Sequence, residues 1–371
     1  MKILVTGADG FLGKNLTLRL KEQDGVDVQR YVRHDRIEML MQAVNDCDAV
    51  IHLAGENRPQ SPEDFELVNV GLTELLCRLI HQTKRKIPVI FSSSTQAGLD
   101  NAYGRSKLSA EQALKAFAQQ NSNPVAIYRL PGVFGKWCKP NYNSVVATFC
   151  HNKAHDLPVQ INDASYLVRL VYVDDVVSSF LKTLHTLQSI DTGVLQPDVE
   201  PEYSITLGEL SAQIDAFKNC RSTLLSERVG TGLVRALYAT YVSYLPKDKF
   251  VYDLPAYGDE RGVFVEMLKT PDAGQFSFFT AHPGITRGGH YHHTKTEKFL
   301  VIKGCARFGF RHMLTNESHT IVTSGDNPQI VETVPGWTHD ITNIGQDEMV
   351  VMLWANEIFD RAHPDTITSK V

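Results

Sequence analysis

The chain has few of the features that mark secreted, membrane-spanning or nucleic-acid-binding proteins. Its 6 cysteines are scattered and form no CxxC pair, a pattern that argues against a disulfide scaffold or a zinc ribbon. No apolar run approaches the roughly 20 residues that span a bilayer, and residues 1–6 have the character of a first strand rather than of a signal peptide. We therefore expect a cytoplasmic protein with reduced thiols and no membrane partner.

An excess of positive charge is also absent. The net charge of −5 and the isoelectric point near 6.3 indicate no basic surface for nucleic acid. The 371 residues are 43% hydrophobic, which is enough for sizeable cores and, at this length, for two or three domains. The composition thus indicates a multidomain globular protein without a nucleic-acid partner.

The pattern of the chain changes near residue 250. Before it, short apolar runs alternate with segments of helical periodicity, which predicts a Rossmann-type parallel sheet with helices on both faces. After it, short alternating segments separated by Gly, Pro, Asn and Asp predict an all-β sandwich or barrel. We therefore expect an α/β domain over 1–245 and an all-β domain over 250–371. The strands expected in the first domain are 2–6, 48–54, 87–94 and 124–129, and its helices are 11–22, 63–83, 104–119, 205–218 and 225–244.

Three glycines follow the first predicted strand. Gly7 permits a tight turn, Gly10 lets the backbone approach a pyrophosphate, and Gly13 permits close packing of the next helix on the strand. The N-terminus of that helix favours phosphate charge. This strand–turn–helix context predicts a dinucleotide-binding site.

Arginines at the end of the second predicted strand favour NADP over NAD. An acidic residue there would bond a ribose hydroxyl, whereas an arginine pairs with the additional phosphate. The segment offers Arg30 and Arg33 before a carboxylate appears at Asp35. We expect NADPH as the cofactor with Arg33 as its phosphate partner, and Asp35 leaves NAD open as the alternative.

Tyr103 and Lys107 stand four residues apart on a predicted helix and so share one face. A nearby ammonium would lower the pKa of the phenol, which could then give a proton to a carbonyl oxygen as hydride reaches the carbon. Lys107 can also hold the nicotinamide ribose. On the preceding strand, alternation places Ser94 opposite Ser93 and makes Ser94 the expected hydroxyl for the carbonyl. These residues predict a reductase.

Together these motifs resemble the extended short-chain dehydrogenase/reductases that act on nucleotide sugars. The resemblance covers residues 1–245 and includes TGADGFLG at 6–13, HLAG at 52–55, Asn69, FSSST, YGRSK and YVDD. It implies further cofactor-binding and substrate-binding positions, and a chain that pairs into a homodimer. The cofactor positions are Phe11, Leu53 and Ala54, and the substrate positions are Arg169 and Asn143.

Histidines concentrate in the second part of the chain, where 7 of the 14 lie between 282 and 339. His290 and His292 form an HxH pair whose imidazoles point to one side of a strand, and Glu297 and His339 can complete a four-ligand set. The spacings Gly-x5-His-x-His-x4-Glu-x6-Gly and Pro-Gly-x2-His-x3-Asn match the two motifs of cupin barrels. We expect a divalent metal here, with zinc favoured, although manganese, iron or nickel would accept the same donors.

A second resemblance competes for His290. Residues 259–264 and the Arg-Gly-Gly-His-Tyr run that ends at Tyr291 are similar to the deoxysugar 3,5-epimerases of the cupin superfamily. This resemblance implies that His290 is a general base and that Lys298 stabilises an enolate oxygen. His290 is therefore expected to be either a base or a metal ligand, with Tyr291 and His293 as alternative proton carriers.

Over nearly its whole length the chain resembles the bifunctional bacterial capsule enzymes that fuse a reductase to a cupin, notably in residues 134–145 and 291–295. The resemblance implies a UDP-linked 4-keto-6-deoxy-N-acetylhexosamine as substrate. The cupin would epimerise C3, and the reductase would then reduce C4 with NADPH. The product would be UDP-N-acetyl-6-deoxy-L-talosamine, on the route to UDP-N-acetyl-L-fucosamine.

Chemistry requires the same order of steps. The C3 proton is acidic only while the neighbouring C4 is a ketone, so epimerisation must precede reduction. Two alternatives stay open. One is a reductase whose cupin is only a structural or dimerising metal module, and the other is a non-catalytic NADP sensor.

Overall fold

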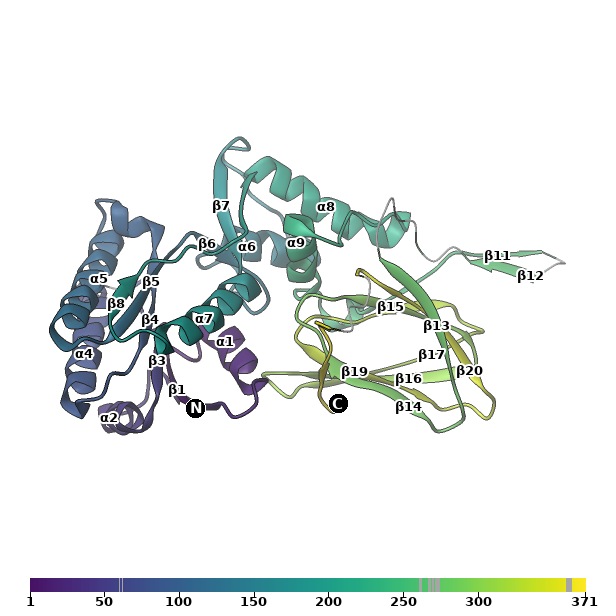
Figure 1. Cartoon of the computed structure of the whole chain (residues 1–371). Helices are drawn as coiled ribbons and strands as arrows, with labels where there is room; N and C mark the ends of the chain where they lie inside the picture. The colour runs from purple at the N-terminus through teal and green to yellow at the C-terminus, as the bar shows by residue number, and fades with distance from the viewer. Residues whose placement is uncertain are drawn as a thin grey trace. The chain divides into compact units, whose positions relative to one another are not determined.

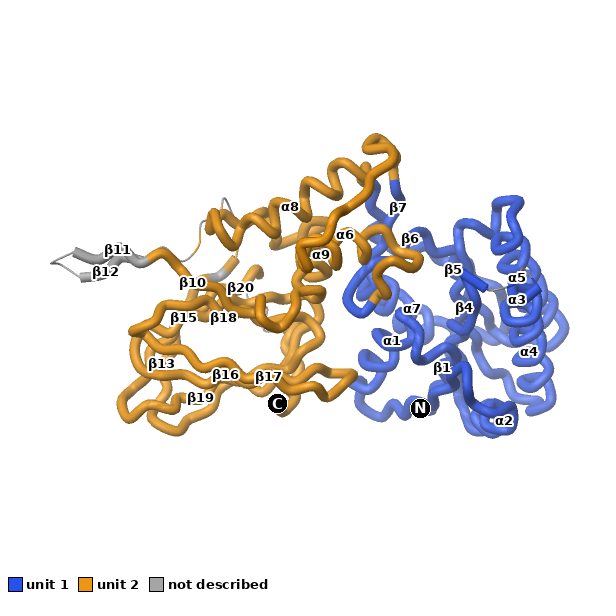
Figure 2. Tube along the Cα trace, turned by 180° about the vertical axis from the view of Figure 1, so that it is seen from behind, with its two compact units in different colours: residues 1–137, 168–204 blue, residues 138–167, 205–371 orange. Residues whose placement is uncertain are grey.

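The structure is a computed structural model that describes every residue except 60, 62, 260, 261, 266, 267, 269, 271–273 and 358–361, and only the backbone of 256–259, 262–265 and 275. The chain divides into two compact units (Figure 2). The first comprises residues 1–137 and 168–204, and the second comprises residues 138–167 and 205–371. These units are not the same as the predicted domains 1–245 and 250–371, whose bounds stay a prediction.

A six-stranded sheet in the order β2-β1-β3-β4-β5-β8 forms the centre of the first unit. All of its strand pairs are parallel. The strand order reverses between β1 and β3, and in such sheets ligands bind beyond the carboxyl ends of the strands at this switch point. The strands are β1 (Lys2–Thr6), β2 (Asp27–Tyr31), β3 (Ala49–His52), β4 (Val89–Ser94), β5 (Pro124–Leu130) and β8 (Gly193–Leu195).

Helices cover both faces of this sheet (Figure 1), which explains why its central strands are continuously apolar. Alternation along β1 divides its side chains between two cores. Ile3 and Val5 lie in one core with α1 and α7, and Leu4 lies in the other with α2, α4 and α5. The helices are α1 (Phe11–Lys21), α2 (Ile37–Asp46), α4 (Leu72–Thr83), α5 (Ala102–Asn121) and α7 (Val173–Gln188).

The helix predicted over 63–83 is divided into three pieces. A short α3 (Glu63–Phe65) leads into a π-helical segment η1 (Glu66–Gly71), and α4 follows. π-Helical turns are rare and frequently mark functional sites, and Asn69 lies in this one.

A small sheet in the order β6-β7-β9 and a short 3-10 helix complete this part of the chain. They are β6 (Gly132–Phe134), β7 (Leu167–Tyr172), β9 (Glu202–Thr206) and η2 (Thr95–Gly98).

Two five-stranded antiparallel sheets face each other in the second unit. Phe299 of one sheet meets Phe308 of the other with ring centroids 5.7 Å apart, so the core lies between the sheets. The first sheet runs β10 (Val251–Asp253), β18 (Gln329–Glu332), β15 (Glu297–Lys303), β20 (Met349–Ala355) and β13 (Gln275–Ala281). The second runs β17 (Ser318–Ser324), β16 (Cys305–His312), β19 (Trp337–Asn343), β14 (Thr286–Tyr291) and β21 (Ile367–Thr368).

Helices precede these sheets in the second unit. The helix predicted over 225–244 begins only at Gly232, after Gly230, a poor helix former, and the N-cap Thr231. A capping box between Thr206 and Glu209 starts α8. The elements are α6 (Val145–Ala154), α8 (Leu207–Thr223), α9 (Gly232–Val242), η3 (Lys247–Lys249) and the hairpin β11 (Ala256–Asp259) and β12 (Gly262–Val265).

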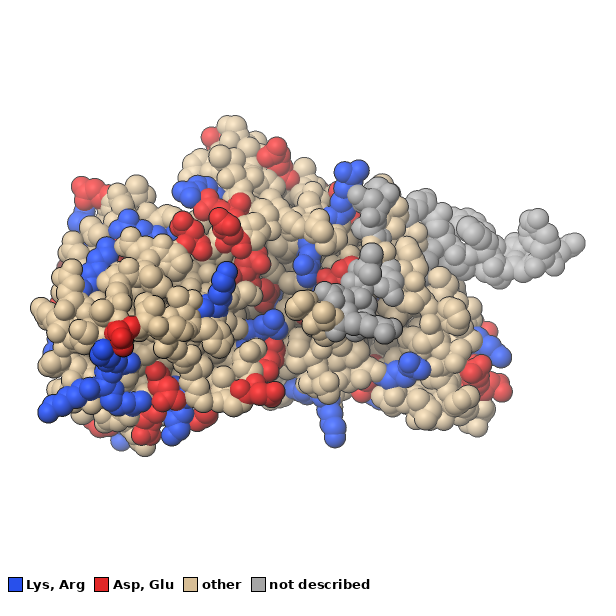
Figure 3. Space-filling view, viewed as in Figure 1, with Lys and Arg blue, Asp and Glu red and all other residues tan. Residues whose placement is uncertain are grey.

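The predicted fold class, a Rossmann-type α/β part followed by an all-β part, is confirmed. In the part of the chain that the structure describes, no helix has both the length and the apolar character that crossing a membrane requires. On the face drawn in Figure 3, basic side chains are interspersed with acidic ones rather than gathered in one patch.

Gly13 offers a test of the tight packing beneath α1. A Cβ at Gly13 would lie 2.2 Å from the carbonyl oxygen of Gly7 and 2.7 Å from the Cα of Ala8. We expect Gly13→Ala to lower the free energy of unfolding by about 1–3 kcal/mol, measured by urea denaturation, because the backbone must move. The control is Gly98→Ala, whose added Cβ meets nothing within 4 Å. Equal stability of the two variants would contradict this packing.

Candidate active site and metal centre

The glycine-rich loop lies at the carboxyl ends of β1 and β3. Gly7 has a φ of 68°, and a Cβ there would lie 2.7 Å from the backbone nitrogen of Ala54. Gly10 is the N-cap of α1, and Phe11 is the first residue of that helix. The structure thus brings the predicted positions Gly7, Gly10, Phe11, Leu53 and Ala54 together, with backbone N–H groups of α1 available for a phosphate.

A buried hydrogen-bond network behind this loop was not predicted from the sequence. The Nδ1 and Nε2 atoms of His52 lie 2.7 Å from Thr6 Oγ1 and 2.9 Å from Thr73 Oγ1. The Thr6 hydroxyl also accepts a hydrogen bond from the Ala54 N–H, at 3.2 Å. Burial, with Lys107 nearby, lowers the pKa of His52 to about 3, so the imidazole is neutral. The network fixes the loop that carries Ala54.

Arg33 follows β2 and is exposed, in the position expected for a cofactor phosphate. It forms an ion pair with Glu56, and Arg30 forms one with Asp9. Asp35 accepts a hydrogen bond from the Val32 N–H and caps its own turn. Glu56, which follows the HLAG motif directly, was not predicted as a site residue, because its approach to Arg33 joins segments 23 residues apart.

Ser94 lies close enough to Tyr103 to lower the pKa of its phenol, whereas Ser93 donates to Glu111 at 2.6 Å on the opposite side of β4. The role of Ser94 toward a substrate carbonyl stays a prediction. Asn101 caps α5 by accepting from the Gly104 N–H at 2.7 Å and so fixes the helix turn that carries Tyr103.

Lys107 is buried on the same face of α5. Its ammonium donates to the Ser92 carbonyl at 2.7 Å and lies 4.4 Å from the centroid of the Phe91 ring. Burial lowers the pKa of Lys107 to about 8, although Glu111 opposes the shift. The expectation that Lys107 lowers the pKa of Tyr103 is wrong for this structure: burial raises that pKa, and only the Ser94 hydrogen bond opposes the rise.

Asn69 joins the segment after β3 to helix α5. Its amide oxygen accepts from the Glu56 N–H at 2.8 Å, and its amide nitrogen donates to the Glu56 carbonyl at 3.0 Å and to Ser106 Oγ at 2.9 Å. The π-helical turn places this side chain, so a helical-wheel argument from the sequence could not have found the contact.

The two predicted substrate residues are both exposed. Arg169 on β7 forms a bidentate ion pair with Glu202, at 2.5 and 2.9 Å. Asn143 lies in the second unit, immediately before Ser144, the N-cap of α6. Their roles toward a substrate stay predictions.

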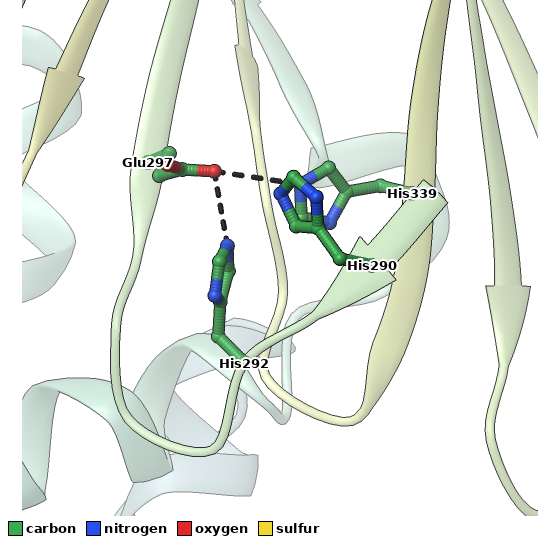
Figure 4. Close-up of side chains that lie close together, drawn as sticks. All are labelled: His290, His292, Glu297 and His339. Atoms are coloured by element: carbon green, nitrogen blue, oxygen red, sulfur yellow. Dashed lines mark hydrogen bonds and ion pairs between the residues drawn. The ribbon is translucent and has the colours of Figure 1, made fainter. Parts of the chain in front are cut away.

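The four predicted metal ligands form one cluster in the second unit (Figure 4). The ligand atoms of His290, His292, Glu297 and His339 all lie within 4.8 Å of one another. Glu297 Oε2 lies 3.1 Å from His292 Nε2 and 3.4 Å from His339 Nε2. This donor set, three imidazoles and one carboxylate, fits a divalent transition metal such as zinc.

Three strands from the two sheets position this cluster. Glu297 begins β15, His339 lies on β19, and His290 lies on β14 opposite His339. The register of that pair shifts at Gly289, where Gly288 and Gly289 have φ values of 94° and 74°. Such a bulge re-aims the following side chain, and here it turns His290 into the cluster.

The cluster is electrostatically prepared for a cation. Burial, with the neighbouring His339 and His292, lowers the pKa of His290 to about 3. Burial alone would raise the pKa of Glu297, but His292 and His339 hold it well below its usual range. The imidazole of His290 and the carboxylate are therefore in the forms that bind metal at neutral pH.

Lys295 was not predicted as a site residue, although it is buried and its ammonium lies 3.0 Å from Glu297 Oε1.

Lys298, which was predicted, is not brought to the cluster. It follows Glu297 on β15 and so faces the other side of the sheet, where it pairs with Glu332. The rings of Tyr291 and His293 meet edge to face, with centroids 5.5 Å apart. Residues 260 and 261 of the epimerase-like segment lie outside the described residues.

Two family models match the chain. The model described as the NAD dependent epimerase/dehydratase family covers residues 3–195, and the model described as the Polysaccharide biosynthesis C-terminal domain covers residues 257–367. The chain belongs to the NAD-dependent epimerase/dehydratase family.

This family member is similar over its whole length to two bacterial proteins of polysaccharide and nucleotide-sugar metabolism. It is 55% identical over 371 residues to UDP-2-acetamido-2,6-beta-L-arabino-hexul-4-ose reductase of Pseudomonas aeruginosa, covering 100% of this chain and 99% of that protein. It is 41% identical to the capsular polysaccharide assembling protein CapF from Staphylococcus aureus, with a TM-score of 0.69 and 100% of both chains covered. The predicted likeness to capsule enzymes of this type is confirmed.

A more distant solved structure shares the fold alone. The UDP-glucuronic acid 4-epimerase from Bacillus cereus in complex with NAD is 19% identical, with a TM-score of 0.52. The match covers 58% of this chain and 83% of that one.

Metal retention separates the two roles that the sequence leaves open for His290. Because its ligand atoms lie with those of the other three residues, we expect His290→Asn to weaken zinc binding at least about 100-fold. The expected size follows because the free energy of zinc binding, on the order of 10 kcal/mol or more, is divided among four donors. Competition with a chelator measures this affinity, and His282→Asn, at an exposed histidine of the same unit, is the control. Unchanged zinc affinity in the His290 variant would identify it as a base instead of a ligand.

Proposed function

We propose that the chain is a bifunctional UDP-sugar enzyme of capsule biosynthesis. The β-sandwich would invert C3 of a UDP-4-keto-6-deoxy-N-acetylhexosamine, and the Rossmann-type unit would reduce its C4 ketone with NADPH to UDP-N-acetyl-6-deoxy-L-talosamine. One observation carries this proposal: a single chain holds both the Ser94, Tyr103 and Lys107 group and a three-histidine, one-glutamate cluster. The names of the relatives, a UDP-linked hexul-4-ose reductase and CapF, support the substrate class.

In the proposed reduction, hydride passes from NADPH to C4 and the Tyr103 hydroxyl gives its proton to O4. The products are NADP+ and a secondary alcohol. Ser94, which lies near Tyr103 and lowers its pKa, would share the carbonyl oxygen with it. Lys107, with a pKa of about 8, is partly able to release a proton near neutral pH and would help to restore that of Tyr103.

In the proposed epimerisation, a base removes the C3 proton, the electron pair moves to O4 as an enolate, and a proton returns on the opposite face. The ammonium of Lys295, beside Glu297, would stabilise the charge on O4. His290, His292, Glu297 and His339 would hold the metal, for which we propose zinc. A bound divalent ion supplies Lewis-acid polarisation of a carbonyl.

The preference for NADPH is supported by Arg33, which follows β2 and whose side chain is 69% exposed. The Asp35 carboxylate already accepts a hydrogen bond from the Val32 N–H. It is therefore less available than a free carboxylate to bind a ribose hydroxyl, as NAD would require. The homodimer and the cytoplasmic location stay predictions.

The placement of Lys298 favours a second candidate, a nucleotide-sugar 4-reductase whose β-sandwich is structural. In the epimerase resemblance this lysine acts on the enolate, but here it pairs with Glu332 on the side of β15 away from Glu297. The two candidates share the reduction step and differ only in the chemistry at C3.

Tyr103→Phe tests the reduction that both candidates require. Removing the hydroxyl deletes the proton donor, so we expect kcat for NADPH oxidation with the UDP-4-keto sugar to fall about 10²- to 10⁴-fold. Tyr166→Phe, at a tyrosine that is 60% exposed, should leave the rate unchanged. A Tyr103 variant within a few-fold of the unmodified enzyme would remove Tyr103 from the proposal.

A further inference from the structure

The segment that follows the last long strand lies along the metal cluster. In the antiparallel pairing of β21 with β14, Thr368 stands opposite His290 and Ile367 opposite Tyr291. The Ser369 N–H donates to the Gly289 carbonyl at 2.8 Å. The strand that carries His290 is therefore bordered by residues 365–369.

Asp365, at the start of this segment, binds the loop between two ligands of the cluster. Its Oδ1 accepts from the His293 N–H at 2.8 Å. Its Oδ2 accepts from the N–H groups of Thr294 and Lys295, at 2.7 and 2.8 Å, and from Thr294 Oγ1 at 3.1 Å. One carboxylate thus satisfies three successive backbone donors of the turn that runs from His292 to Glu297.

The backbone of Asp365 contacts a ligand directly. Its carbonyl oxygen lies within hydrogen-bond distance of His292 Nδ1. A carbonyl can only accept, so Nδ1 carries the proton and Nε2 keeps its lone pair. Nε2 is the atom that lies 3.1 Å from Glu297 Oε2 inside the cluster.

Other residues, Arg235 and Asn356 among them, also tether this loop. Arg235 binds the Thr294 side chain, and Asn356 Oδ1 accepts from the Thr296 N–H at 2.9 Å. Neither of these contacts involves His292. The loop therefore has supports other than Asp365, whereas the partner of His292 Nδ1 is the Asp365 carbonyl.

We infer that Asp365 is a positioning residue of the metal centre: its carboxylate fixes the 292–297 turn, and its carbonyl orients His292 with Nε2 toward the metal. This inference rests on the metal site of the proposed function. Partners of this kind are worth about 10- to 100-fold in metal affinity. Because the Asp365 contacts order the turn before the metal binds, metal binding does not have to overcome the conformational entropy of a free turn.

Zinc affinity of the full-length chain, measured by competition with a chelator, tests the inference. Asp365→Ala removes all the side-chain acceptors, and we expect it to raise the zinc Kd about 10- to 100-fold. Asp365→Asn keeps one acceptor oxygen and should show a smaller increase. Asp347→Asn, at an exposed aspartate of the same unit, should leave the Kd unchanged.

The thermal midpoint of the metal-free variants separates positioning from general support. A weaker zinc Kd at a temperature where all variants are folded supports the inference. A zinc Kd equal to that of Asp347→Asn overturns it, whether or not the midpoint of Asp365→Ala falls. If the unmodified chain binds no zinc, the metal site itself is wrong and the inference fails with it.

Discussion

Both candidate sites depend on charges that the fold holds away from water. The ammonium of Lys107 is buried against the Ser92 carbonyl and the Phe91 ring, and the carboxylate of Glu297 is buried between His292 and His339. A buried charge costs several kcal/mol unless partners surround it. The strand ends and turns that supply those partners must therefore be in place before either site exists, which makes each site a property of the folded unit.

The same constraint explains the role of Lys298. Lys298 and Arg221 both pair with the buried Glu332, and the Tyr238 hydroxyl donates to Glu332 at 3.0 Å. Lys298 and Glu332 stand opposite each other on β15 and β18, while Arg221 and Tyr238 come from α8 and α9. The network fastens the two helices to the sheet. Removing one member of such a group costs about 3–5 kcal/mol, so the lysine that resembles an epimerase residue is committed to packing here.

The parts of the sites that depend on local spacing were predicted from the sequence. The glycine loop around Gly7 lies within one turn, and Tyr103 and Lys107 lie within one helix. Local sequence patterns are therefore enough to predict both. The HxH pair needs only the alternation of a strand. His339 was found through a motif, because the pairing of β14 with β19 leaves no local signal.

What was missed depends on pairings between distant segments. Asp365 reaches His293 across 72 residues, and no periodicity links them. The helix predicted over 63–83 is interrupted by η1, whose π-helical turn is stabilised by tertiary contacts of Asn69 rather than by local propensity. The side of β15 that Lys298 faces follows from strand alternation with Glu297, so its separation from the cluster could be predicted from the sequence.

The two proposed chemistries would be coupled through the ketone that they share. Inversion beside a ketone is close to balanced, and reduction removes the ketone and draws the inversion forward. The order is fixed, because reduction also removes the acidity of C3.

Proton NMR of the UDP-4-keto sugar in heavy water, with the enzyme present and NADPH absent, tests the proposed inversion at C3. We expect loss of the C3 proton signal as deuterium enters, together with the appearance of the C3 epimer. An unchanged C3 signal, with reduction proceeding once NADPH is added, would contradict it and leave a reductase with a structural β-sandwich.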